Sequence, residues 1–308
     1  MEDLLAVDQA RKLFEEYKKT KDPSLLDQAI KLLEGRKCLS CLNQLGLIYT
    51  EKGELDKAIN CFKEALKRSK SEEDSSIIKF NMAIAYYRSR DLQSSYEILR
   101  ELSSGKSSIK THAQRLLAKV CLSFGDIKHV DEARAILESF DEPTEDLVVA
   151  YIFLARNGRK EYLRNAIENT KLLGNKRLLA EAYLSSDNVK DLEKALELFR
   201  DIGDVRGEAR ALYKLSQYKP ELLYEALQKL EESGEGTDSD KVRLLNELYK
   251  RTGILDFLKQ AIKYGEKAKE YLFLARAYVE LAKHENEVEN LRRAVKYYEE
   301  FIKERFGS

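Results

Sequence analysis

Apolar and small side chains recur along the chain in one repeated pattern. An apolar residue is followed three positions later by a small one nine times, from Leu26/Ala29 near the start to Leu291/Ala294 near the end. The small residues are Ala29, Ala58, Ser95, Ala133, Ala166, Ala195, Ala226, Ala261 and Ala294. Their average spacing is about 33 residues, a period that is typical of a solenoid of helical repeats.

Each repeat is predicted to be a helical hairpin. Residues three apart share a helix face, and a small residue on that face lets a second helix cross closely. Before the small residues lie segments with apolar residues at helical spacing, such as Leu42, Leu45 and Tyr49. Turn residues such as Lys52-Gly53-Glu54 separate the two segments. Nine copies of this unit predict an all-α protein.

Composition supports the same fold class. The 308 residues include only 14 Gly and 3 Pro, too few for the frequent turns of an all-β domain. Lys+Arg and Asp+Glu are both 54, so the net charge gives no overall attraction to nucleic acid or acidic membranes. No apolar run is long enough to span a membrane, and the N-terminal residues do not resemble a signal peptide. We therefore expect a cytoplasmic protein, and abundant Lys and Glu without Trp favour a thermophilic source.

One copy of the repeat resembles the tetratricopeptide repeat (TPR) family at the family's characteristic offsets. The matching residues are Leu45, Gly46 and Tyr49, followed by Ala58, Phe62 and Ala65. Leu42 stands at the family's Trp position, and Lys70 at its closing Pro. A second copy follows directly, so residues 39–103 match best, while residues 203–215 resemble a Gly-Asp-x-x-Gly-Glu-Ala variant of the family.

The resemblance implies a right-handed α-α superhelix (solenoid) of about nine hairpins that spans residues 1–308 as a single array. Spacings of 29 and 31 predict shorter, irregular repeats over residues 144–232. The Gly/Ser/acidic segment 233–240 predicts a flexible loop. Residues 241–308 are expected to form C-terminal repeats and a capping helix at about 288–306. Its stripe of Leu291, Val295, Tyr298, Phe301 and Ile302 would shield the final apolar face from water.

No residue pattern indicates catalysis. The three His lie apart from any nucleophile motif, and no phosphate loop or dinucleotide fingerprint occurs. Cys38-x-x-Cys41 has the spacing of half a zinc site, but no second ligand pair follows. Cys41 and Cys61 fall where small apolar side chains pack, and without a secretory signal the four Cys indicate free thiols rather than disulfides. We expect a non-enzyme with packing cysteines, no metal and no cofactor. A metal-binding or redox role for the cysteines is the alternative.

In the TPR family the first helices of successive hairpins line a concave groove, which identifies candidate binding residues here. They are Asn43, Gln44 and Leu47 in one copy, Phe80, Asn81, Ile84, Tyr87 and Arg88 in the next, and Arg115 and Lys119 in the third. Leu47, Phe80 and Ile84 are apolar where a solvated helix needs none. They indicate either a partly apolar groove for an extended or helical peptide, or burial against neighbouring repeats through tight curvature.

The predicted function is a non-catalytic interaction scaffold whose groove receives a peptide segment of another protein. Neither nucleic acid nor a membrane is expected as a partner. One alternative is an RNA-binding helical repeat, which requires basic and polar positions that recur in every copy. Another is the sensory half of a regulator whose output domain lies elsewhere. Because the groove positions change type from copy to copy, a protein ligand is favoured.

Overall fold

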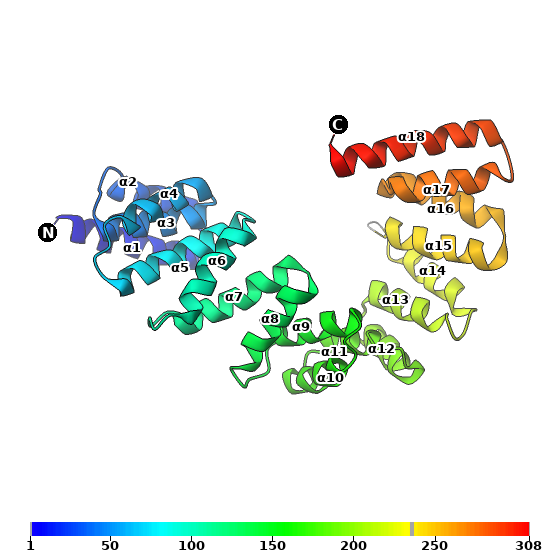
Figure 1. The fold of residues 1–308 in the computed structure, drawn as a ribbon, viewed down its shortest axis with the longest axis horizontal. Helices are drawn as coiled ribbons and strands as arrows, with labels where there is room; N and C mark the ends of the chain where they lie inside the picture. Colours follow the sequence, from blue (N-terminus) through cyan, green and yellow to red (C-terminus); the bar gives the residue numbers. More distant parts are fainter. Residues whose placement is uncertain (1, 235–236, 308) are drawn as a thin grey trace. The chain divides into compact units, whose positions relative to one another are not determined.

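The computed structural model describes residues 2–234 and 237–307, and in this part of the chain it contains eighteen α-helices and no strand (Figure 1). The prediction of an all-α helical-repeat fold is confirmed, and eighteen helices are what nine two-helix units require. The chain divides into two compact units, Met1–Tyr162 and Leu163–Ser308.

The first unit contains four helical hairpins and a ninth helix. Its helices are α1 (Glu2–Thr20), α2 (Pro23–Leu33), α3 (Leu39–Lys52), α4 (Leu55–Leu66), α5 (Glu72–Arg88), α6 (Leu92–Ser104), α7 (Lys110–Phe124), α8 (Ile127–Glu138) and α9 (Glu145–Arg156). Within each hairpin an odd-numbered first helix packs on the even-numbered helix that follows it. First helices also contact each other across hairpins, as α3 contacts α5.

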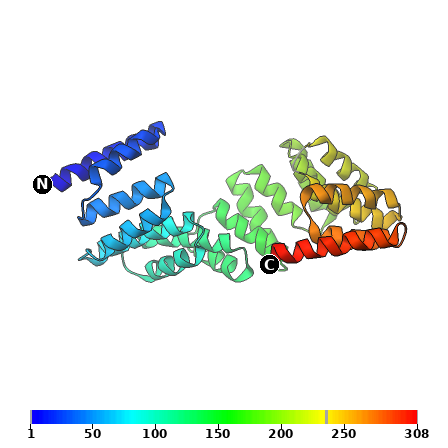
Figure 2. The same cartoon turned by 90° about the horizontal axis from the view of Figure 1, so that it is seen from above.

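The second unit consists of one helix followed by four hairpins, and in each hairpin the first helix packs on the second. Its helices are α10 (Tyr162–Leu173), α11 (Lys176–Leu184), α12 (Val189–Asp201), α13 (Val205–Leu215), α14 (Leu222–Glu232), α15 (Asp238–Thr252), α16 (Leu255–Ala268), α17 (Tyr271–Ala282) and α18 (Glu287–Phe306). The first helices α11 and α13 have 9 and 11 residues, against 17 in α5. Helices α17 and α18 lie side by side at the end of this unit (Figure 2).

The nine small residues of the repeat pattern lie where the sequence places them, on the second helices, and all nine are buried. Ser95 is the one member that is not alanine. Its hydroxyl donates a hydrogen bond of 2.9 Å to the carbonyl oxygen of Ala83 on the first helix of the same hairpin. The polar group is therefore satisfied in the core, and the close helix crossing is kept.

Local signals set the helix ends. Asp22 caps α2 by accepting a hydrogen bond of 2.9 Å from the backbone N–H of Ser24, and Pro23 occupies the first helical position. Gly53 ends α3 in the left-handed conformation that glycine adopts without strain (φ 85°). These caps explain why the turn signals in the sequence locate hairpin boundaries.

The predicted loop at 233–240 is only partly described. Helix α14 ends at Glu232, and α15 begins at Asp238, so residues 238–240 form the first turn of a helix. Residues 235–236 lie outside the described residues. Thr237, directly before α15, is buried, and its hydroxyl donates to the carbonyl oxygen of Gly234 at 3.2 Å.

The capping helix differs from the expectation. Helix α18 does cover α17, but most of the predicted stripe is exposed: Leu291, Val295 and Ile302 are 40%, 58% and 53% exposed, and only Phe301 is half-buried. The residues that face α17 are instead Ala294, which is buried, and Tyr297, whose ring stacks on Tyr278 at 5.7 Å. The helix has two apolar faces, and the one with the smaller and flatter side chains packs inward.

No helix within the described residues combines the length and the apolar character that crossing a bilayer requires.

Candidate functional site

The predicted groove residues come together on α3, α5 and α7 of the first unit. Asn43 on α3 and Asn81 on α5 are 38 positions apart in sequence, yet Asn81 Nδ2 donates a hydrogen bond of 3.0 Å to Asn43 Oδ1. An amide side chain has two donor hydrogens and an acceptor oxygen, so one mutual bond leaves hydrogen-bonding capacity on both residues. We call the surface formed by Asn43, Leu47, Phe80, Asn81, Ile84 and Arg88 the first-helix surface.

A second polar link ties the other end of these two helices. Arg88 on α5 donates to the backbone carbonyl oxygen of Thr50 at 3.1 Å and forms an ion pair with Glu51, both on α3. The guanidinium is therefore held across two consecutive repeats. Nearby, the hydroxyl groups of Tyr87 on α5 and Ser123 on α7 lie 3.2 Å apart, which continues the contacts to the fourth hairpin.

The apolar members of the first-helix surface are half-buried. Leu47 packs against the hydrophobic clusters on both sides of α3. The ring of Phe80 meets the imidazole of His112 edge-on, with ring centres 6.4 Å apart. Leu47, Phe80 and Ile84 are thus neither fully in the core nor fully solvated.

The third copy contributes paired cations. Arg115 on α7 forms an ion pair with Glu142, and its guanidinium lies 4.5 Å from the centre of the Phe140 ring. Lys119 is 3.9 Å from the carboxylate of Asp146. Both carboxylates stand at or just before the start of α9. The positive charges predicted for the groove are therefore matched by acidic residues of the next repeat.

Gln44 is the candidate residue that lies deepest. It is 5% exposed, and within the described part of the chain its Nε2 is buried without a hydrogen-bond partner. A buried donor without a partner costs about 1–3 kcal/mol of stability. Its side chain is thus a packing residue with one unsatisfied donor, rather than an accessible groove residue.

Comparison with known proteins identifies the repeat. Two segments, residues 40–71 and residues 268–301, match models described as tetratricopeptide repeat. The chain contains tetratricopeptide repeats. The first matched segment contains α3 and α4, and the second contains α17 and most of α18. No curated protein matches the sequence.

Solved structures are similar to this TPR protein at low sequence identity. The apo form of RapI has a TM-score of 0.59 and 15% identity, and the match covers 98% of this chain and 97% of RapI. A Rap protein complexed with Competence and Sporulation Factor has a TM-score of 0.40 and 15% identity over 98% and 96% of the two chains. Aspartyl phosphate phosphatase F from Bacillus subtilis has a TM-score of 0.44 and 15% identity over 96% and 81%. The likeness to RapI concerns the fold alone.

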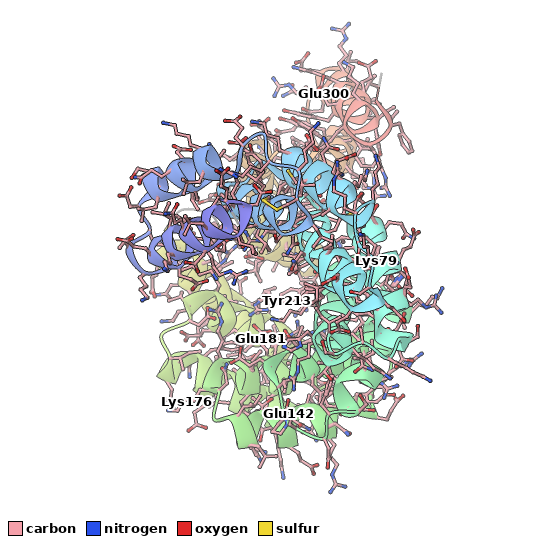
Figure 3. The ribbon with its side chains drawn as sticks, turned by 90° about the vertical axis from the view of Figure 1, so that its left-hand side faces the viewer. Lys79, Glu142, Lys176, Glu181, Tyr213 and Glu300 are labelled. Atoms are coloured by element: carbon pink, nitrogen blue, oxygen red, sulfur yellow. A yellow bond between two sulfur atoms is a disulfide. The ribbon has the colours of Figure 1, made fainter. Side chains whose placement is uncertain are left out.

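The cysteines correct one expectation from the sequence. Cys38 and Cys41 form a disulfide, drawn in yellow in Figure 3. Cys38 caps α3 with an extended backbone, and this brings its Cα within 5.1 Å of that of Cys41, well inside the range that a disulfide spans. Cys121 is buried and Cys61 is half-buried, as expected of packing residues.

The described residues place one carboxylate beside this pair. Asp3, Cys38 and Cys41 have potential ligand atoms within 4.8 Å of one another. Cysteine binds a metal ion as its thiolate, however, and the two sulfur atoms of a disulfide are not thiolates. In its disulfide form the cluster therefore does not fit a zinc site.

The TPR protein has a second candidate surface, which the sequence did not indicate. A cavity of about 930 Å³ lies in the second unit between α15, α17 and the C-terminal part of α18. It is lined by Tyr249, Lys250, Tyr271, Phe273, Arg276 and Phe301, among others. Burial, together with a hydrogen bond of 3.1 Å to Glu280, raises the pKa of Tyr249. Aromatic residues at helical spacing predict side chains that pack in the core. The same spacing occurs in the wall of a cavity, so the sequence alone does not distinguish the two.

Proposed function

We propose that this TPR protein is a non-catalytic scaffold that binds a peptide segment of another protein on the first-helix surface. The observation that carries the proposal is the hydrogen-bonded pair Asn43 and Asn81, which joins two consecutive repeats and keeps donor and acceptor capacity on both amides. An extended peptide presents alternating N–H and C=O groups, which paired amides can bind without selecting one side chain.

The apolar neighbours supply the second part of the proposal. Leu47, Phe80 and Ile84 are half-buried side chains beside the asparagine pair. A binding partner that covers them gains apolar burial, at roughly 25 cal/mol per Å² of surface removed from water. Amides for the peptide backbone and apolar contacts for its side chains together suit an extended or helical segment.

Charge favours a peptide over RNA as the ligand. Arg88, Arg115 and Lys119 each lie within ion-pair distance of an acidic side chain of an adjacent repeat. An RNA-binding groove needs cations that face the phosphates along its length. The paired cations instead suit a ligand of low net charge.

A selected peptide tests the proposal. Peptides would be selected from a displayed library against the full chain, and their dissociation constants measured by calorimetry. Phe80→Ala is expected to weaken binding at least tenfold, because truncating a central aromatic anchor costs about 2 kcal/mol or more. Leu172→Ala is the matched control, since Leu172 is 76% exposed on α10 in the other unit.

Two results would contradict the proposal. Unchanged affinity of Phe80→Ala for every selected peptide would place the binding surface elsewhere. A lowered melting temperature for Phe80→Ala, with unchanged affinity per folded molecule, would favour burial by neighbouring repeats instead.

A further inference from the structure

Helix α18 exposes an uninterrupted apolar stripe at the end of the second unit. Val288, Leu291, Val295, Tyr298 and Ile302 are 64%, 40%, 58%, 37% and 53% exposed. The face toward α17 is made by other residues, chiefly Ala294 and Tyr297. Val288, Leu291 and Val295 also line a shallow hollow with Arg292. Figure 1 shows α18 as the last helix of the unit, with α17 on one side of it.

The spacing of the stripe is that of a two-helix seam. From Val288 the apolar residues follow at intervals of three, four, three and four, which is the a/d pattern of a heptad repeat. A helix that only caps an array needs one apolar face, and α18 already uses that face on α17. The second apolar face is therefore free to pack against another helix.

The charged residues beside the stripe indicate which helix fits against it and whether the two helices run parallel or antiparallel. Arg292 and Glu299 take the same flanking position in successive heptads, directly after Leu291 and Tyr298. Both are exposed. In an antiparallel pair of α18 helices these flanking positions face each other, so that each arginine meets a glutamate. In a parallel pair each residue lies level with its own copy, and the segments rich in like charge, such as Arg292, Arg293 and Lys296, lie side by side.

We propose that α18 is a self-association surface that pairs antiparallel with α18 of a second copy of this chain. Leu291 packs against Ile302 of the partner subunit, and Val295 against Tyr298 of the partner subunit. Arg292 then lies beside Glu299 of the partner subunit. A two-fold axis repeats every contact, so the interface is isologous and closes as a dimer.

Sedimentation of the purified full chain over a range of concentrations tests the pairing. The wild-type chain is expected to dimerise. Val295→Asp is expected to weaken dimerisation at least tenfold, because it places a charge in the apolar seam. The Val295 side chain is exposed in the monomer, so the substitution is not expected to disturb folding. Lys171→Glu, on the exposed side of α10, is the matched surface control. A wild-type chain that stays monomeric, or a dimer that Val295→Asp leaves intact, overturns the proposal.

Charge exchange tests the antiparallel direction. Arg292→Glu alone and Glu299→Arg alone each place like charges opposite one another, and both are expected to weaken the dimer. The double variant Arg292→Glu/Glu299→Arg restores opposite charges and is expected to dimerise like the wild type. A mixture of the two single variants is expected to form a heterodimer. Failure of both restorations overturns the antiparallel pairing.

Discussion

The ring of Phe62 occupies the space in which a side chain on Gly46 would begin. A Cβ on Gly46 would lie 2.4 Å from Cε1 and 2.6 Å from Cζ of that ring. Phe62 is fully buried, so the ring has no free space into which it can turn. The same relationship recurs in the second unit, where a Cβ on Gly207 would lie 2.2 Å from Cδ1 of Phe199. Glycine is needed at both positions for helix contact rather than for backbone freedom.

Gly46→Ala is therefore expected to destabilise the protein, although alanine is the better helix former. Overpacking a buried contact costs about 1–3 kcal/mol, whereas Gly to Ala in a helix gains about 1 kcal/mol. Urea unfolding of the single variant measures the net loss. Gly46→Ala/Phe62→Leu should recover part of it, because the smaller side chain removes the clash. An equally stable Gly46→Ala variant would contradict the packing described here.

The repeat architecture was predictable because it depends on local residues. Small residues at a fixed period locate the helix crossings, and Gly46 and Phe62 already occupied the family's offsets. The packing face of α18 was not predictable. Its sequence contains two apolar stripes, one through Val295 and one through Tyr297, and periodicity alone does not say which of them meets α17.

The sequence predicted which residues share this side of the hairpins, but it did not predict their hydrogen bonds or their burial. Helical spacing brought Asn43 and Asn81 to the same side of consecutive hairpins, but no pattern in the sequence indicated that the two amides bind each other. Gln44 is one position from Asn43, and this rotates its side chain into the core. The disulfide was not predictable, because it depends on the cap geometry that brings Cys38 close to Cys41, and the Cys-x-x-Cys spacing alone does not show that geometry.

Counting reactive thiols tests the disulfide. Alkylation after unfolding without reductant is expected to modify two thiols, Cys61 and Cys121, and four after reduction. In the folded protein burial raises the pKa of Cys61, and burial raises that of Cys121 to about 12. Both should therefore react slowly at neutral pH, because the thiolate is the reactive form. Four modified thiols in the unfolded, unreduced sample would show that the disulfide is absent.

Gln44→Met is expected to stabilise the chain by about 1 kcal/mol, since it removes a buried donor that lacks a partner and keeps the side-chain volume. Thermal unfolding of the free protein measures this gain. Asn43→Leu, next to it and half-buried, is the control, because it breaks the bond to Asn81 and should not stabilise. A destabilised Gln44→Met variant would show that the amide makes a favourable interaction.

Asp91 gives the stability of α6 a defined pH dependence. Its carboxylate accepts hydrogen bonds from the hydroxyl of Ser94 at 2.7 Å and from the Ser94 N–H at 3.0 Å, and these lower the pKa of Asp91. A carboxyl whose pKa is lower in the folded state stabilises the fold above its unfolded pKa, which is about 3.9 for Asp. This stability is lost as pH falls through the folded value.

Asp91→Asn retains a capping side chain but does not titrate, so it isolates the charge. The wild type is expected to be more stable than this variant at pH 7, and the difference should shrink on acidification below about pH 4. Urea midpoints across the pH range measure it. A difference that stays constant with pH would contradict the role of the ionised cap.

Hydrogen exchange with and without a selected peptide tests the proposed binding surface most directly. Peptide bound on the first-helix surface should slow exchange in Leu39–Lys52 and Glu72–Arg88, the helices that carry Asn43, Phe80 and Asn81. Protection confined to Asp238–Thr252 and Tyr271–Ala282, which line the cavity of the second unit, would contradict the proposal and move the binding site there.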